Sequence, residues 1–374
     1  MKERLLFISR KWPPAVGGME SYSVSLAESL KPHFEVSLLV LPGRPDGRPP
    51  GLLAYALFLL RATGHVLLHA RKYRHLVLGD LVLFPTAVVS RLLAQTQSRS
   101  VVLYGLDLVY QRRSGLLPKL YGGFFSLFSA VQGLFTTKVA ISSYTRQLAF
   151  EAGLSEVQVI TPCLPESPLT AASPDASLLP EEFAASKRRI LYFGRLVPRK
   201  GAEWFAREVL PALPEDATFF VVGAPTDPAY HQRLIGHPRV RYLGRQPNDV
   251  LASLIAHADL VVMPNIPTPD AVDAEGFGLV AVEAASLGAI LVAARLQGIV
   301  DAVVDGKTGI LVTAVDAEAW RETVVALLRE SGEQRQARRE LAASTCRKDY
   351  SLDKLGSSFT SLLLSNPNNC EEQR

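Results

Sequence analysis

Two cationic residues, Arg195 and Lys200, lie five positions apart in the segment FGRLVPRKG, residues 193–201. The apolar run at 189–193 is typical of a buried strand, so both side chains are expected at the carboxyl end of a strand, beside the start of a helix. Phosphate groups bind at such places. Arginine offers a diphosphate a planar fork, and lysine offers it a compact charge. The alternative for this segment alone is a basic corner exposed to water.

Two glutamates flank a glycine-rich segment later in the chain, residues 273–284, with the sequence DAEGFGLVAVEA. The glycines leave room for a ligand near backbone N–H groups at the start of a helix. Glu283 follows Glu275 by eight residues, slightly more than two helical turns, so both return to about the same face. Glu283 belongs to a strongly apolar helix, where burying a carboxylate without a partner costs several kcal/mol. We therefore expect the pair to bind hydroxyl groups; helix capping by Glu275 and a solvated Glu283 is the alternative.

A third glycine-containing loop follows the first predicted strand, residues 4–9. Gly17 and Gly18 are adjacent there, which allows a phosphate or a sugar to approach the backbone closely. The loop lacks the GxGxxG spacing, so a dinucleotide cofactor is not supported. A simple tight turn would also explain it.

Short apolar runs alternate with helical stretches in both halves of the chain, which predicts an α/β protein with two doubly wound, Rossmann-like domains facing a central cleft. The predicted strands are 4–9, 34–40, 75–79, 100–105, 138–142 and 157–161, then 189–193, 218–223, 240–244, 260–264, 289–293 and 309–312. A proline-rich segment, residues 162–180, is predicted to connect the domains. The predicted domains are residues 1–165, with the C-terminal helix 350–366 packing back on it, and residues 186–348.

Composition indicates a folded protein in a reducing compartment. Of the 374 residues, 48% are hydrophobic and 20% are charged. Cys163, Cys346 and Cys370 are far apart and lack the spacing of a disulfide framework or a zinc site. No cleavable leader and no apolar run of membrane-spanning length is expected. We therefore expect a cytoplasmic protein without a metal site.

The charge is unevenly distributed. Residues 1–180 hold 18 Lys and Arg against 11 Asp and Glu, whereas the remainder holds 22 against 25. Basic residues mixed with leucines in the first half favour peripheral contact with an anionic membrane or a phosphorylated lipid. An ordinary solvated face is the alternative. No nucleic-acid partner is expected, because no aromatic–basic RNA motif or helix-turn-helix pattern is present.

The order of these segments resembles the GT-B glycosyltransferases of family 4, retaining enzymes also called glycosyltransferase group 1. The resemblance covers nearly the whole chain and is carried by the GGxE loop, the FGRLxxxKG segment and the EGFGLxxxEA segment. Residues 258–264 (ADLVVMP) and 303–312 (VVDGKTGILV) support it. It implies a hexosyltransferase that moves a sugar from a UDP- or GDP-sugar to a glycan or lipid-linked saccharide, in the synthesis of cell-surface polysaccharides or glycoconjugates.

The resemblance also implies a role for each matching position. Arg195 and Lys200 would neutralise the donor diphosphate, Glu275 would bind the transferred sugar, and Glu283 would hold the ribose hydroxyls. Backbone amides of Phe277, Gly278 and Leu279 would touch the sugar and the distal phosphate, Gly17 and Gly18 would close over the phosphates, and the base would lie near Gly244 and Arg245. The chain contains no DxD motif, so a metal-bridged diphosphate is not expected and no cofactor is required.

One departure from the family affects activity. Where the family has HGxD, this chain has Tyr104 and Asp107 in the sequence YGLD. We place both on the acceptor or sugar side of the site, although Tyr104 would not act as a base near neutral pH and could equally be a packed aromatic residue. Two other functions stay open. One is a sugar-nucleotide epimerase of the GT-B type, and the other is a non-catalytic protein that binds nucleotide sugars.

Overall fold

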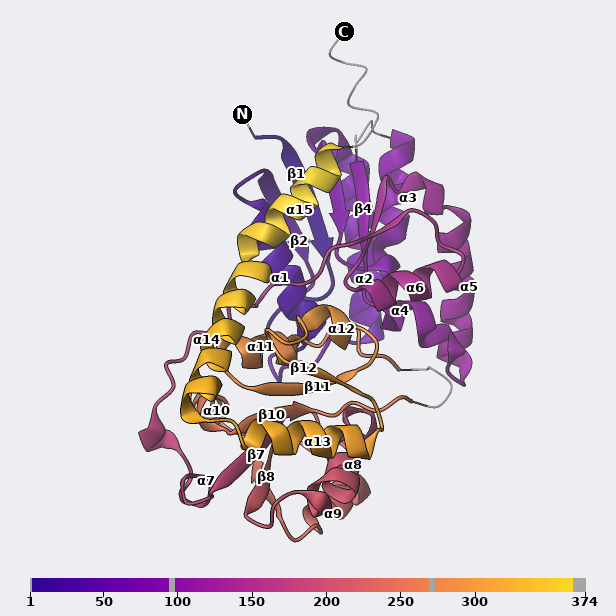
Figure 1. Ribbon diagram of the computed structural model, residues 1–374. Helices are drawn as coiled ribbons and strands as arrows, with labels where there is room; N and C mark the ends of the chain where they lie inside the picture. Colours follow the sequence, from indigo (N-terminus) through magenta and orange to yellow (C-terminus); the bar gives the residue numbers. More distant parts are fainter. Residues whose placement is uncertain (1, 94–97, 269–272, 366–374) are drawn as a thin grey trace. The chain divides into compact units, whose positions relative to one another are not determined.

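Two six-stranded sheets organise the chain, one in each of two units. The computed structural model describes residues 2–93, 98–268 and 273–365 (Figure 1). Contacts divide the described residues into a first unit, residues 2–163 with 273–276 and 351–365, and a second unit, residues 164–268 with 277–350. Cys370 and residue 366 lie outside the described residues.

The first sheet is entirely parallel, with the strand order β2-β1-β3-β4-β5-β6. Its strands are β1 (Arg4–Ser9), β2 (Glu35–Val40), β3 (His75–Leu78), β4 (Ser98–Leu103), β5 (Thr137–Ala140) and β6 (Val157–Val159). Each strand predicted in this half is present, with boundaries shifted by up to two residues. Every residue of β3, β4 and β5 is buried, including one basic side chain in each strand, His75, Arg99 and Lys138.

Helices cover both faces of this sheet. They are α1 (Gly18–Leu30), α2 (Leu52–His69), α3 (Phe84–Leu93), α4 (Leu106–Val109), α5 (Leu116–Ala130), α6 (Ser143–Glu151) and α15 (Leu352–Leu364), with the short turns η1 (Ala70–Lys72), η2 (Leu81–Leu83), η3 (Tyr110–Arg112) and η4 (Gln132–Leu134). One core joins alternate strand residues to α2, α3, α5 and α6. Helix α15 packs against α1 so closely that a Cβ on Gly356 would lie 2.3 Å from the Ser29 carbonyl oxygen.

The second sheet is also parallel, with the order β12-β11-β10-β7-β8-β9. Its strands are β7 (Arg188–Phe193), β8 (Ala217–Val222), β9 (Val240–Gly244), β10 (Leu260–Met263), β11 (Leu291–Arg295) and β12 (Ile310–Thr313). This is the order of a doubly wound Rossmann sheet, in which the chain changes direction between the adjacent strands β7 and β10. Ligands bind outside the carboxyl ends of the strands at that point.

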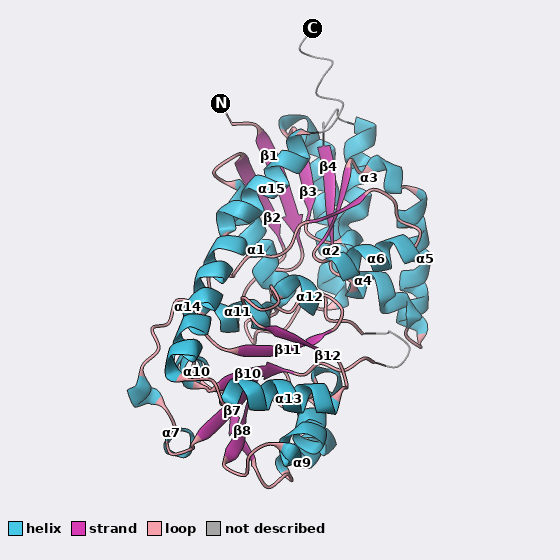
Figure 2. Cartoon of the chain, in the orientation of Figure 1, coloured by secondary structure: helices cyan, strands magenta, loops and turns pink. Residues whose placement is uncertain are grey.

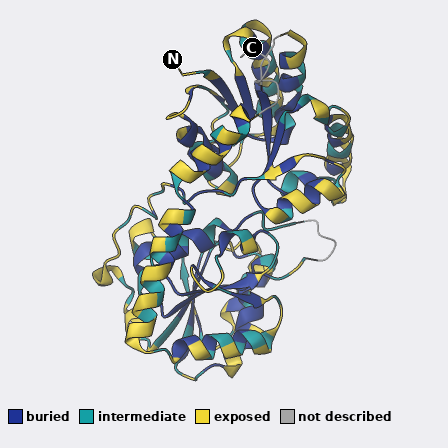
Figure 3. Ribbon diagram, turned by 45° about the horizontal axis from the view of Figure 1, so that its top comes forward, coloured by how far each residue is buried: buried dark blue, intermediate teal, exposed yellow. Residues whose placement is uncertain are grey.

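The helices of the second unit are α7 (Glu181–Ala184), α8 (Ala202–Trp204), α9 (Pro228–Ile235), α10 (Asn248–His257), α11 (Leu279–Ser286), α12 (Ile299–Ala302), α13 (Ala317–Leu328) and α14 (Gly332–Asp349) (Figure 2). Single turns occur at η5 (Ala176–Leu178), η6 (Pro198–Lys200), η7 (Phe205–Val209) and η8 (Leu210–Ala212). Trp204, Phe205 and Trp320 pack together in its core. In both units the central strands are buried, whereas the edge strands β2, β6 and β9 are partly exposed, and the exposed residues lie mainly on the outer faces of the helices and in loops (Figure 3).

One sequence-based expectation is wrong. A helix within the described residues, Leu52–Lys72, which is α2 together with η1, is long and apolar enough to cross a membrane. The sequence criterion required an uninterrupted apolar run, and Arg61 interrupts it without making the helix polar. Helix α2 nevertheless buries Phe58, Ala62 and Val66 against the first sheet. Length and composition alone therefore do not make it a membrane span.

Candidate functional site

The loop after β7 is fixed against the residues that follow β10. Leu196 is fully buried, and Gly201 has a φ of 74°, a left-handed conformation that favours glycine. A Cβ on Gly201 would lie 1.8 Å from the Pro264 carbonyl oxygen. The backbone N–H of Ile266 donates to the carbonyl oxygen of Arg199 at 3.0 Å. The two loops at the switch point therefore form one packed floor, and the glycine after Lys200 is required for their close approach.

Lys200 and Glu283 are electrostatic neighbours beside this floor. Lys200 lies in η6 and is only 9% exposed, while Glu283 lies half-buried in the middle of α11. Burial raises the pKa of the Glu283 carboxyl to about 7, and the positive charge of Lys200 acts in the opposite direction. The structure thus brings together an ammonium group and a carboxyl group that the sequence separates by 83 positions. Arg195, the other predicted cation, is exposed.

The start of α11 lies at the same edge of the sheet. Gly278 has a φ of 100°, and a Cβ there would lie 3.1 Å from Met263 Cε, at the end of β10. Phe277 is buried, and its ring packs edge-on against Tyr350 with centroids 6.0 Å apart. Leu279 is the first residue of α11. The predicted residues 277–279 therefore form a helix N-terminus, whose first N–H groups have no partner within the helix.

Gly244 ends β9 and is the third of three glycines aligned at neighbouring strand ends. Gly194 follows β7, and Gly223 follows β8. A Cβ on Gly223 would lie 1.9 Å from the Gly194 carbonyl oxygen. The backbone N–H of Gly223 donates to the Gly244 carbonyl oxygen at 2.9 Å. The chain thus carries no side chain at the first position of each of these three strand ends. The neighbouring Arg245, predicted to lie near the base, is exposed.

Glu275 is half-buried, and its contacts assign it to the first unit. Its association with Glu283 across the donor sugar stays a prediction. The cleft predicted between the domains also stays a prediction.

In the first unit, the glycine loop leads into α1. Gly17 precedes the helix, and Gly18 is its first residue. Glu20, in the first turn, is buried, and its Oε1 lies 4.0 Å from Lys11 Nζ. A Cβ on Gly17 would lie 2.6 Å from Glu20 Oε2. The carboxylate of Glu20 therefore lies beside this helix start, and contact of Gly17 and Gly18 with phosphates stays a prediction.

Tyr104 follows β4 and is an interior residue, only 6% exposed. Its hydroxyl lies 3.3 Å from Ser23 Oγ, and its ring packs edge-on against Tyr22. Its backbone N–H donates to Asp107 Oδ1 at 3.1 Å. Burial raises the pKa of the Asp107 carboxyl to about 6, although that hydrogen bond opposes the shift. The predicted contact of Tyr104 and Asp107 with a sugar or acceptor stays a prediction.

Sequence analysis missed a polar cluster beside these residues. Arg10 Nε and Asp80 Oδ2 form a largely buried ion pair at 2.8 Å, and the Arg10 guanidinium lies 4.7 Å from the ring centroid of Tyr55. Burial lowers the pKa of the neighbouring Lys11 ammonium, and Arg10 lowers it further. Arg10 directly follows β1, and Asp80 comes two residues after β3. Their position after the first and third predicted strands was the signal that could have identified them.

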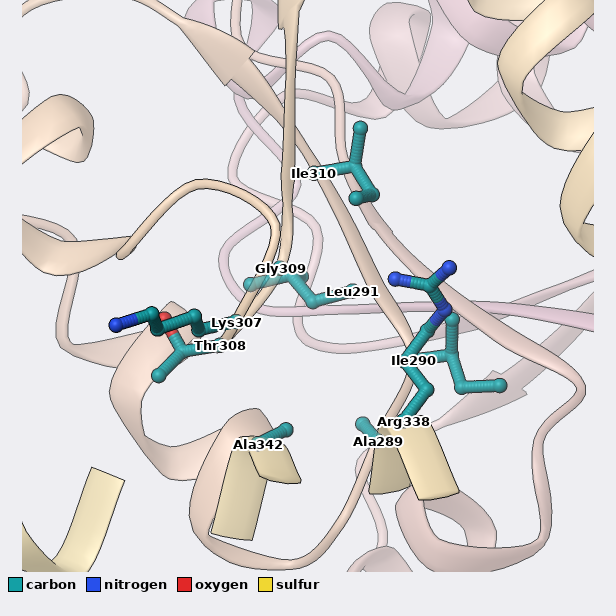
Figure 4. A pocket seen from close by; sticks show the side chains of 9 residues that line it. All are labelled: Ala289, Ile290, Leu291, Lys307, Thr308, Gly309, Ile310, Arg338 and Ala342. Carbon is teal, nitrogen blue, oxygen red and sulfur yellow. The ribbon is translucent and has the colours of Figure 1, made fainter. Parts of the chain in front are cut away.

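A small pocket of about 180 Å³ lies elsewhere in the second unit, lined by Leu291, Ile310, Arg338 and Ala342 among others (Figure 4). It adjoins the amino ends of β11 and β12, the opposite edge of the sheet from Lys200. It is therefore not part of the candidate site. Across residues 2–93, 98–268 and 273–365, no three His, Cys, Asp or Glu side chains gather as a metal site. Metal independence stays a prediction.

Comparison with known proteins identifies the second unit. Residues 187–330 match the family described as glycosyl transferases group 1. This span contains Lys200, Gly278 and Glu283. The match covers less than half of the chain and lies within the second unit. Among curated proteins, the D-inositol 3-phosphate glycosyltransferase of Salinispora arenicola is 31% identical over 207 residues, which are 49% of this chain and 44% of the relative.

A second relative is the GDP-mannose-dependent alpha-(1-6)-phosphatidylinositol monomannoside mannosyltransferase of Mycolicibacterium smegmatis. It is 30% identical over 223 residues, 57% of this chain and 56% of the relative. The chain thus spans about half the length of the curated relatives it matches.

Solved structures support the fold over the whole chain. HepE of Anabaena, in complex with UDP and glucose, has a TM-score of 0.68 at 19% identity, covering 97% of this chain and 100% of that one. Sucrose-phosphate synthase of Thermosynechococcus elongatus has a TM-score of 0.68 at 18% identity, covering 96% and 98%. The predicted GT-B fold, built from two Rossmann-like units, is confirmed.

Proposed function

We propose that this protein is a retaining, metal-independent glycosyltransferase. It moves a hexose from a UDP- or GDP-sugar to a glycan or lipid-linked saccharide, in the synthesis of cell-surface polysaccharide or glycoconjugate in the cytoplasm. The observation that carries the proposal is the Lys200–Glu283 neighbourhood at the switch point of the second sheet, within the segment that matches the group 1 family.

The donor diphosphate would lie over the β7 loop, close to the Lys200 ammonium and within reach of the exposed Arg195. Leaving-group departure places negative charge on the phosphate, and one preorganised charge at such a position contributes roughly a hundred- to a thousandfold in rate. The first N–H groups of α11 add donors for the distal phosphate. The chain therefore offers positive charge and N–H groups for a diphosphate.

Glu283 would accept hydrogen bonds from the two ribose hydroxyls. The ionised carboxylate offers one oxygen to each hydroxyl, and its charge-assisted hydrogen bonds are stronger than those of the protonated group. Because the pKa of Glu283 is about 7 in the empty protein, hydroxyl binding has to draw the carboxyl towards its ionised form. Glu283 thus couples donor binding to proton release.

In the transfer step, the bond between the anomeric carbon and the phosphate oxygen breaks, and a bond from that carbon to an acceptor hydroxyl oxygen forms on the same face. The departing phosphate takes the acceptor proton, so no side chain serves as base. Glu275 would hold the transferred sugar. The products are the glycosylated acceptor and UDP or GDP.

The relatives support both donor classes. HepE was crystallised with UDP and glucose, and the Mycolicibacterium relative is named for GDP-mannose and a phosphatidylinositol mannoside acceptor. A lipid-linked acceptor also agrees with the basic first half of the chain. The nucleotide base, the sugar and the acceptor are to be determined by binding and transfer assays.

Isothermal calorimetry with UDP, GDP, ADP and their sugars tests the proposal. We expect one nucleotide class to bind, and Lys200→Met to weaken that binding on the order of a hundredfold, as expected for a lost charge contact. Lys187→Met, an exposed lysine before β7, is the control and should bind as the unaltered protein does. Equal affinity of the Lys200 variant would refute the assignment.

One observation favours a second candidate, a non-catalytic protein that binds nucleotide sugars. Tyr104 stands where the family has histidine, and its hydroxyl is engaged with Ser23 inside the first unit. Donor binding without hydrolysis, and without transfer to any member of a broad panel of oligosaccharide and polyprenyl-linked acceptors, would favour this candidate.

A further inference from the structure

The outer face of α2 is a stripe of exposed leucines. Leu53, Leu57, Leu60 and Leu68 follow one another at helical spacing and are 57–77% exposed. The opposite face of the helix is buried in the core of the first unit. Helix α2 therefore has an apolar outer face as well as an apolar inner face.

Helix α5 repeats this arrangement. Leu116, Leu120 and Leu127 recur at spacings of four and seven residues and are 56–72% exposed. Phe125 and Phe128 on its inner side belong to the same core as α2. Both helices cover the same face of the first sheet, so both leucine stripes belong to one outer layer. Exposed apolar side chains gathered on one outer layer mark an interaction site.

The charges around these stripes have one sign. Between positions 47 and 150 the chain has twelve Lys and Arg but only two acidic residues, Asp80 and Asp107. Asp80 is buried, and Asp107 is partly buried. Neither α2 nor α5 contains an Asp or a Glu. Five exposed cations make no ion pair within the described part of the chain: Arg61, Arg71, Lys72, Arg91 and Lys119.

The exposed leucines and the surrounding positive charge together indicate which partner this surface binds. A second copy of the chain, docked through the same face, would bring two basic surfaces together, which is unfavourable. An acidic, apolar surface complements both features, and a bilayer containing anionic lipids is such a surface. The buried inner faces of α2 and α5 keep these helices on the sheet. The surface suits an interfacial position and not a transmembrane one.

We propose that the outer faces of α2 and α5 dock on an anionic lipid bilayer. The leucine stripes enter the boundary between headgroups and acyl chains, and the surrounding cations contact lipid phosphates. This inference deepens the proposed function, on which it rests for its purpose, because docking would bring the first unit to a lipid-linked acceptor.

Co-sedimentation of the full chain with lipid vesicles tests the docking. The probes are vesicles of phosphatidylcholine alone and of phosphatidylcholine with phosphatidylglycerol, at low and at high salt. We expect binding to the anionic vesicles, weakened by salt because exposed charges are screened. Arg71→Gln/Lys72→Gln should weaken binding on the order of tenfold or more, since each basic residue near an anionic surface contributes about 1 kcal/mol.

The chain offers a matched control for each change. Arg347 and Lys348 form the same adjacent pair, exposed on α14 of the second unit, and their double glutamine variant should bind as the unaltered protein does. Leu57→Ser/Leu60→Ser should weaken binding about tenfold or more through lost apolar burial, whereas Leu341→Ser, also on α14, should not. Circular dichroism of each variant verifies that it is folded.

Three outcomes would overturn the proposal. The first is no vesicle binding, and the second is binding that neither the Arg71/Lys72 nor the Leu57/Leu60 double variant reduces. The third is a leucine-dependent dimer in analytical ultracentrifugation without vesicle binding. Retention of the protein in vesicles at high salt and alkaline pH would contradict an interfacial position. Calorimetry with UDP and GDP on the same preparations separates this test from that of the transferase function, because the membrane variants should keep full nucleotide affinity.

Discussion

Replacing Glu283 by glutamine should stabilise the empty second unit at alkaline pH and leave its stability unchanged at acidic pH. Burial raises the pKa of Glu283 from 4.5 to about 7. A group with a raised folded-state pKa keeps its proton to a higher pH in the folded protein than in the unfolded chain. The free energy of unfolding therefore falls as pH rises from about 4.5 to about 7. A shift of this size corresponds to roughly 3 kcal/mol once the pH exceeds 7, at about 1.4 kcal/mol per unit.

Glutamine resembles the protonated carboxyl in shape and charge. The variant should therefore match the unaltered protein near pH 4.5 and exceed its unfolding free energy by roughly 3 kcal/mol at pH 8. The variant should also lose nucleotide affinity, because a glutamine amide has one neutral acceptor oxygen, whereas a carboxylate offers two charged ones to the ribose hydroxyls.

Urea denaturation followed by tryptophan fluorescence measures the unfolding free energy of the second unit. Trp204 and Trp320 both lie in the core of the second unit, and Trp12 is the single tryptophan outside it. A Trp12→Phe background makes the signal specific. Glu318→Gln on α13, an exposed glutamate, is the control. A stability difference that is the same at pH 5 and pH 8, or a destabilised Glu283 variant at pH 8, would refute the reasoning.

Three further predictions follow from the geometry. Nucleotide binding should weaken up to tenfold for each pH unit below about 7 in the unaltered protein, because Glu283 must lose its proton; calorimetry in buffers of different ionisation enthalpy would detect the released proton. Gly201→Ala should destabilise the second unit by several kcal/mol, because its φ is positive and its Cβ would overlap a carbonyl oxygen, whereas Gly332→Ala, which has open space, should not. Tyr104→Phe should lower stability by about 1 kcal/mol through the lost contact with Ser23, with transfer rates unchanged; a large loss of transfer with stability intact would show that the hydroxyl serves the substrate.

The architecture could be predicted because it depends on local patterns. Buried parallel strands are apolar along their whole length, so each strand appears in the sequence as a short apolar run. The glycine at position 201 is explained by its own backbone conformation and by the carbonyl oxygen it lies against. The apolar runs and the glycine itself are visible in a segment of a few residues, whereas the contact of Gly201 with Pro264, 63 positions away, is not.

The electrostatics of the site could not be predicted, because they arise from long-range packing. Nothing in the segment 193–201 shows that Lys200 is buried and Arg195 exposed. The proximity of Lys200 to Glu283 exists only because β7 and β10 are adjacent in the sheet. The inward orientation of the Tyr104 hydroxyl depends likewise on Ser23, a residue of α1. Pattern alone identified the residue types and left their environments open.

The same distinction explains α2. Sequence composition shows that 52–69 is apolar, and a crossover helix of a doubly wound domain is expected to be apolar on the side that faces the sheet. Only the fold shows that Leu57 and Leu60 lie on the opposite side, where packing does not account for them. The outer leucines therefore require a reason outside the unit, which the membrane supplies.

The environment of Glu283 argues that the site evolved for a ligand. Without bound nucleotide, burial makes the ionised form of Glu283 unfavourable despite the nearby Lys200. Above pH 7 the buried carboxylate therefore lowers the free energy of unfolding. A carboxylate kept for structure would be expected to have a lowered pKa, as a group stabilised by its partners does. A site that must receive two hydroxyl donors has the opposite requirement, because the carboxylate is stabilised only when those donors arrive. The raised pKa of Glu283 is the consequence of that requirement, and its fall on nucleotide binding is the measurement that separates a binding site from a structural ion pair.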